Sequence, residues 1–128
     1  MLLNLTDQSS ESLQDQIIRQ IRAKILRGEL LPDDGLPSIR VFARKNHVSV
    51  ITVQRSYERL LNEGLIHSRR NRGFFISELS DSKKSKLAQQ RLIENIEPVI
   101  YNAVNEGMIR EDISNLINNV LKNIKKGK

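Results

Sequence analysis

The stretch SIRVFARKNHVSVITVQRSYERLLNEG, residues 38–64, contains two short apolar patterns of helical spacing, separated by a turn at His47. Ser38 and Ser49 each stand directly before one of these patterns, and serine is a preferred residue at the N-terminus of a helix. Gly64 ends the second pattern, as glycines often end helices. The stretch therefore predicts two helices, each beginning after its serine, that form a helix-turn-helix.

A further helix is expected before this stretch. Residues 12–27 repeat Ile and Leu at helical spacing with Arg and Gln between them, and Gly28 follows directly. This is the pattern of an amphipathic helix that ends at a glycine. Residues 28–38 hold two prolines and two glycines, so they predict an irregular loop.

A β-hairpin is expected after the stretch. Residues 65–68 and 74–77 are short β-prone runs on either side of the sequence RRNRG, residues 69–73. Asn71 and Gly73 both tolerate a positive φ, which suits the tip of a hairpin. A winged helix-turn-helix, with this hairpin as a two-stranded β wing, is therefore the fold predicted from residue 12 onwards.

The C-terminal part predicts two more helices. Residues 77–86 have little to bury and predict a linker or the frayed start of a helix. Two apolar stripes follow, separated by Gly107, and Pro98 in the first is expected to kink or restart its helix near Glu97. The stripes include Leu92, Ile96, Val99, Ile100, Ala103, Ile113, Leu116, Ile117, Val120 and Leu121. Two helices of this length cannot bury two apolar faces alone, so they need a partner, either the N-terminal domain or a second copy.

The length of 128 residues allows one compact domain and an appendage, which we place at residues 1–78 and 79–128 of a mainly α chain. No cysteine is present, so disulfides and thiolate metal sites are excluded. No apolar run approaches the length of a membrane-spanning helix, and the first residues lack the features of a signal peptide. We expect a cytoplasmic protein without a membrane partner.

Positive charge is concentrated in the middle of the chain. Residues 38–75 carry eight Lys and Arg against two acids, whereas residues 1–37 have a net charge of −2 and residues 76–128 a net charge of +2. Charge that served solubility alone would be spread more evenly. The distribution therefore indicates a polyanionic partner for the helix-turn-helix and its wing.

An ordered set of short motifs carries a family resemblance. These are I-L-R-G-x-L-x-P from Ile25, L-P-S-x-R from Leu36, V-S-x-x-T-V from Val48, Y-x-x-L-x-x-E-G-L-I from Tyr57 and R-x-R-G-x-F-x from Arg70. Together they resemble the DNA-binding domain of the GntR family of transcription regulators. The short two-helix tail is similar to that of the YtrA subfamily. This resemblance implies a homodimer formed through the C-terminal stripes, and control of operons that often encode ABC transporters.

Three positions depart from the family pattern. Asp33 stands where the family has a turn glycine, and aspartate also adopts the left-handed conformation. Val50 replaces an arginine that many members place after the serine of the turn, so one expected DNA contact is absent. Gln14 replaces a tyrosine, which removes packing rather than chemistry. The second departure means that no operator sequence can be carried over from the family.

The helix that follows Ser49 is the expected reader of DNA. Ser49, Thr52 and Gln54 offer hydroxyl and amide groups to base edges and phosphates in the major groove, and Gln54 suits bidentate pairing with adenine. Val50 or Ile51 is placed to contact a thymine methyl. Among the basic residues of the two helices, Arg40 matches a family position that binds phosphate, while Arg44 and Arg55 face either solvent or DNA.

The wing is expected to follow the minor groove. Arg69, Arg70, Asn71 and Arg72 would form its tip, and Gly73 would allow the close turn. Guanidinium groups suit this position because they stay charged and grip phosphate bidentately. One of the two phenylalanines that follow is expected to pin the hairpin to the core.

These features predict a sequence-specific regulator of transcription that binds a palindromic double-stranded operator as a homodimer, with repression implied by the resemblance. The operon of its own gene and a transporter are the implied targets. The alternative is a winged-helix module that binds protein or RNA without specific DNA readout. The sequence leaves open whether a small-molecule effector binds.

An enzyme is not expected. The two histidines, His47 and His67, have no close Ser, Asp or ligand-spaced partner in sequence. The acidic pair Glu111 and Asp112 falls in the first turn of a predicted helix, where it complements the dipole. We therefore predict no metal, no cofactor and no catalytic residue.

Overall fold

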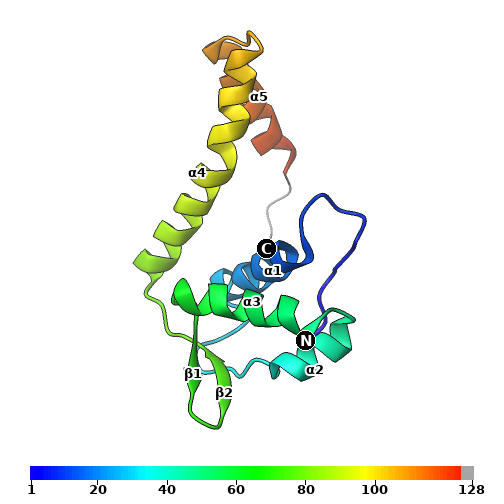
Figure 1. Cartoon of the computed structure of the whole chain (residues 1–128). Helices are drawn as coiled ribbons and strands as arrows, with labels where there is room; N and C mark the ends of the chain where they lie inside the picture. The colour runs from blue at the N-terminus through cyan, green and yellow to red at the C-terminus, as the bar shows by residue number, and fades with distance from the viewer. Residues whose placement is uncertain (125–128) are drawn as a thin grey trace. The chain divides into compact units, whose positions relative to one another are not determined.

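A computed structural model describes residues 1–124, so residues 125–128 of the basic tail lie outside the described chain. The elements are α1 (Leu13–Leu26), α2 (Ile39–Asn46), α3 (Val50–Asn62), β1 (Ile66–Arg69), β2 (Gly73–Ile76), α4 (Asp81–Asn105) and α5 (Arg110–Asn123) (Figure 1). The chain divides into two compact units, Met1–Lys84 and a second that begins at Ser85. The predicted fold class is confirmed, because the first unit is a winged helix-turn-helix and the rest is helical.

Serine side chains set the starts of the first three helices. The Oγ atoms of Ser12, Ser38 and Ser49 accept hydrogen bonds from the backbone N–H groups of Asp15, Val41 and Thr52, at 3.0, 3.2 and 3.1 Å. Each bond satisfies one of the N–H groups that a helix leaves without an internal partner. His47 ends α2 in the left-handed conformation, with a φ of 56°, and this forms the predicted turn before α3.

The core of the first unit lies between α1, α2, α3 and the wing. The fully buried side chains include Ile17, Ile21, Phe42, Val53, Tyr57, Leu60, Leu65 and Ile76. A buried ion pair joins α1 to the end of α3, where Arg22 donates to both carboxylate oxygens of Glu63, at 2.7 Å from Nη2. This ion pair ties the C-terminal end of α3 to α1. The N-terminal end of α3 makes no side-chain bond of this kind to α1.

The strand β2 of the wing makes backbone hydrogen bonds along both of its edges. The strands β1 and β2 are antiparallel, and β2 also exchanges backbone bonds with the loop at residues 33–36. In that loop the N–H of Asp33 donates to the carbonyl of Ile76 at 2.8 Å. The ring of Phe74 packs edge-on against Tyr57, with centroids 5.1 Å apart, so Phe74 is the residue that pins the hairpin to the core.

An N-terminal arm, residues 1–6, is held through its backbone. The side-chain amide of Gln20 both accepts from the N–H of Asn4 (2.9 Å) and donates to its carbonyl (2.8 Å). Gln16 makes the same two bonds to Thr6, at 3.0 and 2.8 Å. Two residues of extended chain and one turn of helix both advance about 6 Å, so successive pairs stay in register. Asn46 holds the start of the arm to the end of α2.

The structure selects between the alternatives that the sequence left for α4. The helix begins at Asp81, inside the segment predicted as a linker or frayed start, because Ser80 Oγ accepts from the N–H of Lys83 at 3.1 Å. It also continues through Pro98 to Asn105 as one element, so the proline does not restart it. None of the helices within residues 1–124 is long and apolar enough to cross a membrane.

Tyr57→Phe tests the centre of the first unit. Tyr57 is buried and its hydroxyl donates to the carbonyl of Pro37 at 2.8 Å, so its loss should lower the free energy of unfolding by about 1 to 2 kcal/mol. Urea titration followed by circular dichroism at pH 7 measures this difference. Tyr101→Phe, at an exposed tyrosine of α4, is the control and should leave stability unchanged.

The same tyrosine should also make stability depend on alkaline pH. Burial raises the pKa of Tyr57 above its ordinary value of 10.0. Below pH 10 both folded and unfolded chains keep the proton, whereas above it the unfolded chain loses the proton first. The free energy of unfolding should therefore fall by up to about 1.4 kcal/mol per pH unit above pH 10, and Tyr57→Phe should remove that part of the slope.

Candidate nucleic-acid interface

The turn between α2 and α3 exposes the first residues of α3. The hydroxyl oxygens of Ser49 and Thr52 lie 2.7 Å apart in a hydrogen bond, in addition to the capping bond from the N–H of Thr52. Either hydroxyl can be the donor in that bond, so one of the two protons remains available to a phosphate or base. The two predicted contact residues therefore act as one pre-arranged pair.

One face of α3 points into solvent along its first half. Val50 and Ile51 are 44% and 50% exposed, so their methyl groups are accessible at the surface of the helix. Gln54 and Arg55 follow one turn later and are exposed as well. Glu58 comes one further turn along the same face, so an acid ends this surface. The structure thus places all four predicted side chains together.

The basic residues of α2 are also exposed. Arg40 stands in the first turn of α2 and Arg44 in the last, on the helix that precedes the turn. Neither forms an ion pair with any carboxylate in residues 1–124. Their charges are therefore not neutralised by the described chain.

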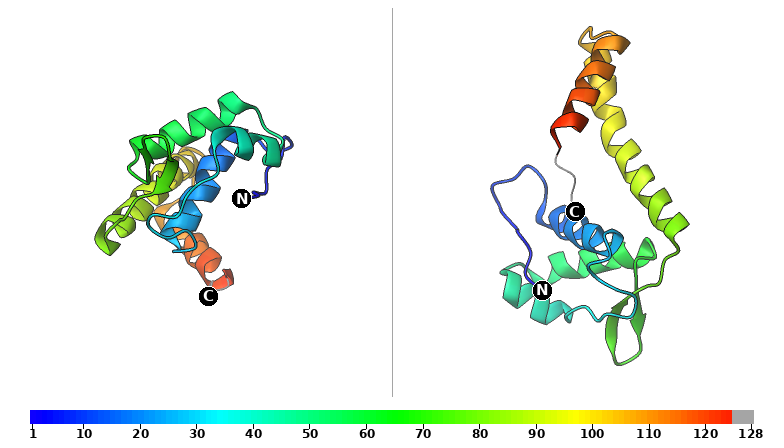
Figure 2. Two further views of the ribbon diagram at one scale, coloured as in Figure 1. Left: turned by 90° about the horizontal axis from the view of Figure 1, so that it is seen from below. Right: turned by 180° about the vertical axis from the view of Figure 1, so that it is seen from behind.

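The wing tip carries three of the predicted residues into solvent. Arg70, Asn71 and Arg72 are exposed between the two strands, and the N–H of Arg72 donates to the carbonyl of Arg69 at 2.9 Å to close the turn. Asn71 and Gly73 have φ values of 62° and 102°, which confirms the predicted positive φ at both positions. Figures 1 and 2 show the wing and α2 projecting on the same side of α3.

Arg69 differs from the other wing arginines. Its guanidinium lies over the ring of Phe75, 4.3 Å from the centroid, and its Nη2 donates to the carboxylate of Asp33. Phe75 also stacks against His67, on the face of the hairpin opposite to Phe74. The sequence predicts that Asp33 lies in the loop, but it does not indicate the ion pair with Arg69. The two residues are 36 positions apart in the chain.

No metal centre is formed by the described residues. No group of three or more His, Asp or Glu side chains in residues 1–124 could hold a metal ion. His67 Nδ1 lies 3.0 Å from Ser77 Oγ in a hydrogen bond across the hairpin, and His47 ends α2. Both histidines therefore have local structural roles.

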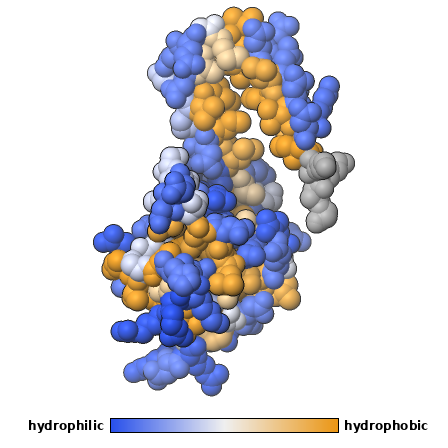
Figure 3. Space-filling view, turned by 90° about the vertical axis from the view of Figure 1, so that its right-hand side faces the viewer, coloured by the Kyte–Doolittle hydropathy of each residue, from blue (hydrophilic) through white to orange (hydrophobic). Residues whose placement is uncertain are grey.

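The second unit has an uncovered apolar groove. A cavity of about 530 Å³ is open to solvent between α4 and α5. It is lined by the ten apolar residues proposed above for the dimer interface, together with Met108 and Ile124. Figure 3 shows hydrophobic side chains along the facing sides of these helices. Neither helix has a buried residue, so the described chain leaves this surface without a cover.

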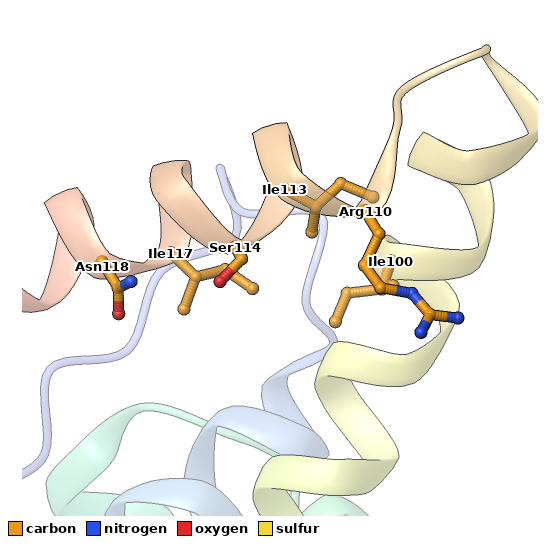
Figure 4. Close-up of a pocket in the computed structure, with 6 residues that line it drawn as sticks. All are labelled: Ile100, Arg110, Ile113, Ser114, Ile117 and Asn118. Carbon is orange, nitrogen blue, oxygen red and sulfur yellow. The ribbon is translucent and has the colours of Figure 1, made fainter.

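A smaller cavity of about 280 Å³ lies on the side of α5 where Arg110, Ser114 and Asn118 form a polar row (Figure 4). Ile100, Ile113 and Ile117 complete its lining.

The first unit matches a known family. Residues 13–76, from the first residue of α1 to the last of β2, fit the family model described as bacterial regulatory proteins, gntR family. The chain belongs to this family. Over 127 residues this GntR chain is also 29% identical to the HTH-type transcriptional repressor YtrA of Bacillus subtilis, covering 99% of this chain and 98% of that protein.

Two solved structures extend the comparison. A GntR family transcriptional regulator from Listeria monocytogenes has a TM-score of 0.73 at 25% identity, over 90% of this chain and 98% of that one. AraR(DBD), solved in complex with operator ORX1, has a TM-score of 0.51 at 25% identity, over 60% of this chain and 98% of that one. The protein is therefore a short YtrA-like GntR regulator of transcription with a DNA-binding winged helix, and not an enzyme.

Proposed function

We propose that this GntR protein represses transcription by binding a palindromic operator as a homodimer. The observation that carries the proposal is that the exposed start of α3 and the exposed arginines of the wing tip belong to one compact unit. A helix end that offers hydroxyl, amide and methyl groups suits the major groove. Guanidinium groups on a neighbouring hairpin suit the phosphate backbone or the minor groove.

In this proposal the residues divide by role. Gln54, with the Ser49 and Thr52 pair, reads base edges, and Val50 or Ile51 contacts a thymine methyl. Arg40, Arg70 and Arg72 hold phosphate and position the protein, with Arg44 and Arg55 at the border of the surface. Asn71 and Gly73 shape the wing tip. Contacts to phosphate supply affinity on any DNA, whereas contacts to base edges supply the preference for one sequence.

The dimer is proposed to form through α4 and α5, within the region 79–128. Ten apolar side chains that line one open groove offer a surface that a second copy of the chain can cover. The similarity to YtrA extends over both helices, which supports a shared arrangement of the tail. Two winged domains held in this way would meet two half-sites about one helical turn of DNA apart.

The remaining parts of the proposal rest on resemblance. Repression is proposed because the relative YtrA is a transcriptional repressor. The proposed targets, the operon of the regulator's own gene and a transporter, are those that the family resemblance implies. We propose the cytoplasm as its location, because a repressor acts where its operator is.

Fluorescence anisotropy tests the proposal. The protein is titrated onto the duplex upstream of its own gene and onto a scrambled duplex, at two salt concentrations, with single-stranded RNA as a competitor. Preference for the natural duplex that persists at physiological salt, with two protomers bound per site, is the expected result. Equal and salt-sensitive binding to both duplexes would contradict sequence-specific recognition there, and a preference for RNA would favour an RNA-binding module.

A further inference from the structure

Asp33 is the acidic residue that contacts a wing arginine within residues 1–124. Its Oδ1 accepts from Arg69 Nη2, while the Arg69 guanidinium lies over the ring of Phe75. The side chains of Arg69 and Asp33 are 41% and 71% exposed, so the pair sits at the surface of the wing. Arg70 and Arg72, at the tip, have no such partner among the described residues.

The backbone of Asp33 is held independently of Arg69, and this keeps its side chain beside the wing. Asp33 adopts a φ of 70°, and its N–H donates to the carbonyl of Ile76 at 2.8 Å. The backbone carbonyl oxygen of the next residue, Asp34, accepts from the N–H of Ile76 at 2.9 Å. The backbone of the loop is therefore bonded to β2 at both Asp33 and Asp34. A negative charge is therefore built into the flank of the wing.

We infer that Asp33 attenuates the grip of the wing on DNA phosphate, an inference that rests on the proposed function. An exposed ion pair is weak, so a phosphate competes with Asp33 for Arg69. While the pair persists, the guanidinium of Arg69 is neutralised and is not free to bind phosphate. The wing then acts with the charge of two arginines rather than three.

This attenuation matters because binding to bulk DNA consists almost entirely of phosphate contacts. A wing with three free arginines would hold the protein longer on every sequence that it meets. One acid beside the wing lowers that background affinity without touching the base-reading face of α3. Asp33 thus limits how much of the protein is occupied by non-operator DNA.

Asp33→Asn tests the inference in the full-length protein. Asparagine adopts the left-handed conformation as readily as aspartate, so the loop should keep its shape. Affinity for a scrambled duplex should rise about threefold to tenfold, and the slope of log affinity against log salt should steepen by about one. Anisotropy titrations over a series of salt concentrations measure both quantities.

Asp34→Asn is the matched control. It removes the same charge one residue later, but the Asp34 carboxylate accepts from the N–H of Leu31 at 2.8 Å instead of binding arginine. A second control places Asp33→Asn in a protein that already carries Arg69→Gln. There Asp33→Asn should no longer raise the affinity, because the arginine that it would free from the ion pair is absent. Circular dichroism of each variant shows whether the fold is kept.

The outcomes separate the inference from the function on which it rests. Equal gains in Asp33→Asn and Asp34→Asn, or a gain that survives in the Arg69→Gln background, would overturn the inference by showing a general charge effect. Unchanged or weaker binding by Asp33→Asn would overturn it too, because the pair would then orient Arg69 for DNA. A wild-type protein that binds no duplex would instead refute the proposed function, before any variant is compared.

Discussion

Ile117→Lys should turn the protein into a monomer and lower its affinity for the operator about a hundredfold. Ile117 is half-buried in α5 and lines the apolar groove. In a dimer formed through this groove the new ammonium would lose its water without gaining a partner, which is costly for a charge. Each winged domain would then bind its half-site alone.

Asn119→Lys is the matched control for this prediction. It adds the same charge to the same helix, but two positions further along, which places it on the opposite side of α5. Light scattering after size exclusion gives the mass of each variant, and anisotropy gives its affinity. If Ile117→Lys remained a dimer with full affinity, the interface would have to lie elsewhere on the chain.

Gln54→Ala and Arg70→Ala should weaken binding in two different ways. Gln54→Ala should lower affinity for the natural operator about tenfold and remove the preference at one base pair, because a bidentate contact to a base is lost. Arg70→Ala should lower affinity a few-fold on every duplex and reduce the salt slope by about one, because a phosphate contact is lost.

A panel of duplexes, each with one operator base pair changed, distinguishes these effects. Gln54→Ala should bind the operator and the duplex changed at the base pair read by Gln54 with equal affinity, whereas the wild type distinguishes them. Arg70→Ala should bind the duplexes of the panel in the same order of affinity as the wild type. Equal losses by both variants on all duplexes would show that the division between reading and positioning residues is wrong.

Local signals in the sequence were enough to predict the first unit. A serine cap, an apolar pattern and a terminal glycine act within a few residues, so α2 and α3 begin where Ser38 and Ser49 indicate. The positive φ of Asn71 and Gly73 is likewise a property of the turn itself. The predicted reading face of α3 is exposed because its apolar pattern determines which side is buried.

Contacts between residues far apart in the chain could not be predicted from the sequence. The Asp33 and Arg69 pair depends on the loop lying beside the wing, which no periodic pattern records. The choice between Phe74 and Phe75 as the anchor depends on the register of the hairpin. The sequence also left open whether Pro98 restarts α4, and the structure shows that the helix continues. The carbonyl left without a donor belongs to Glu94, an exposed residue that water can serve.

The N-terminal arm has a consequence for how this protein can diverge. Gln16 and Gln20 recognise peptide groups, which every residue except proline presents alike, so these bonds constrain the side chain at position 4 very little. At position 6 the hydroxyl of Thr6 also accepts from the N–H of Gln8, so that side chain is under a constraint of its own. Sequence change at position 4 should therefore be tolerated, whereas the two glutamines of α1 are required. An insertion of one residue between Asn4 and Thr6 would be more damaging than a substitution at position 4, because the two peptide groups would no longer match the spacing of Gln16 and Gln20.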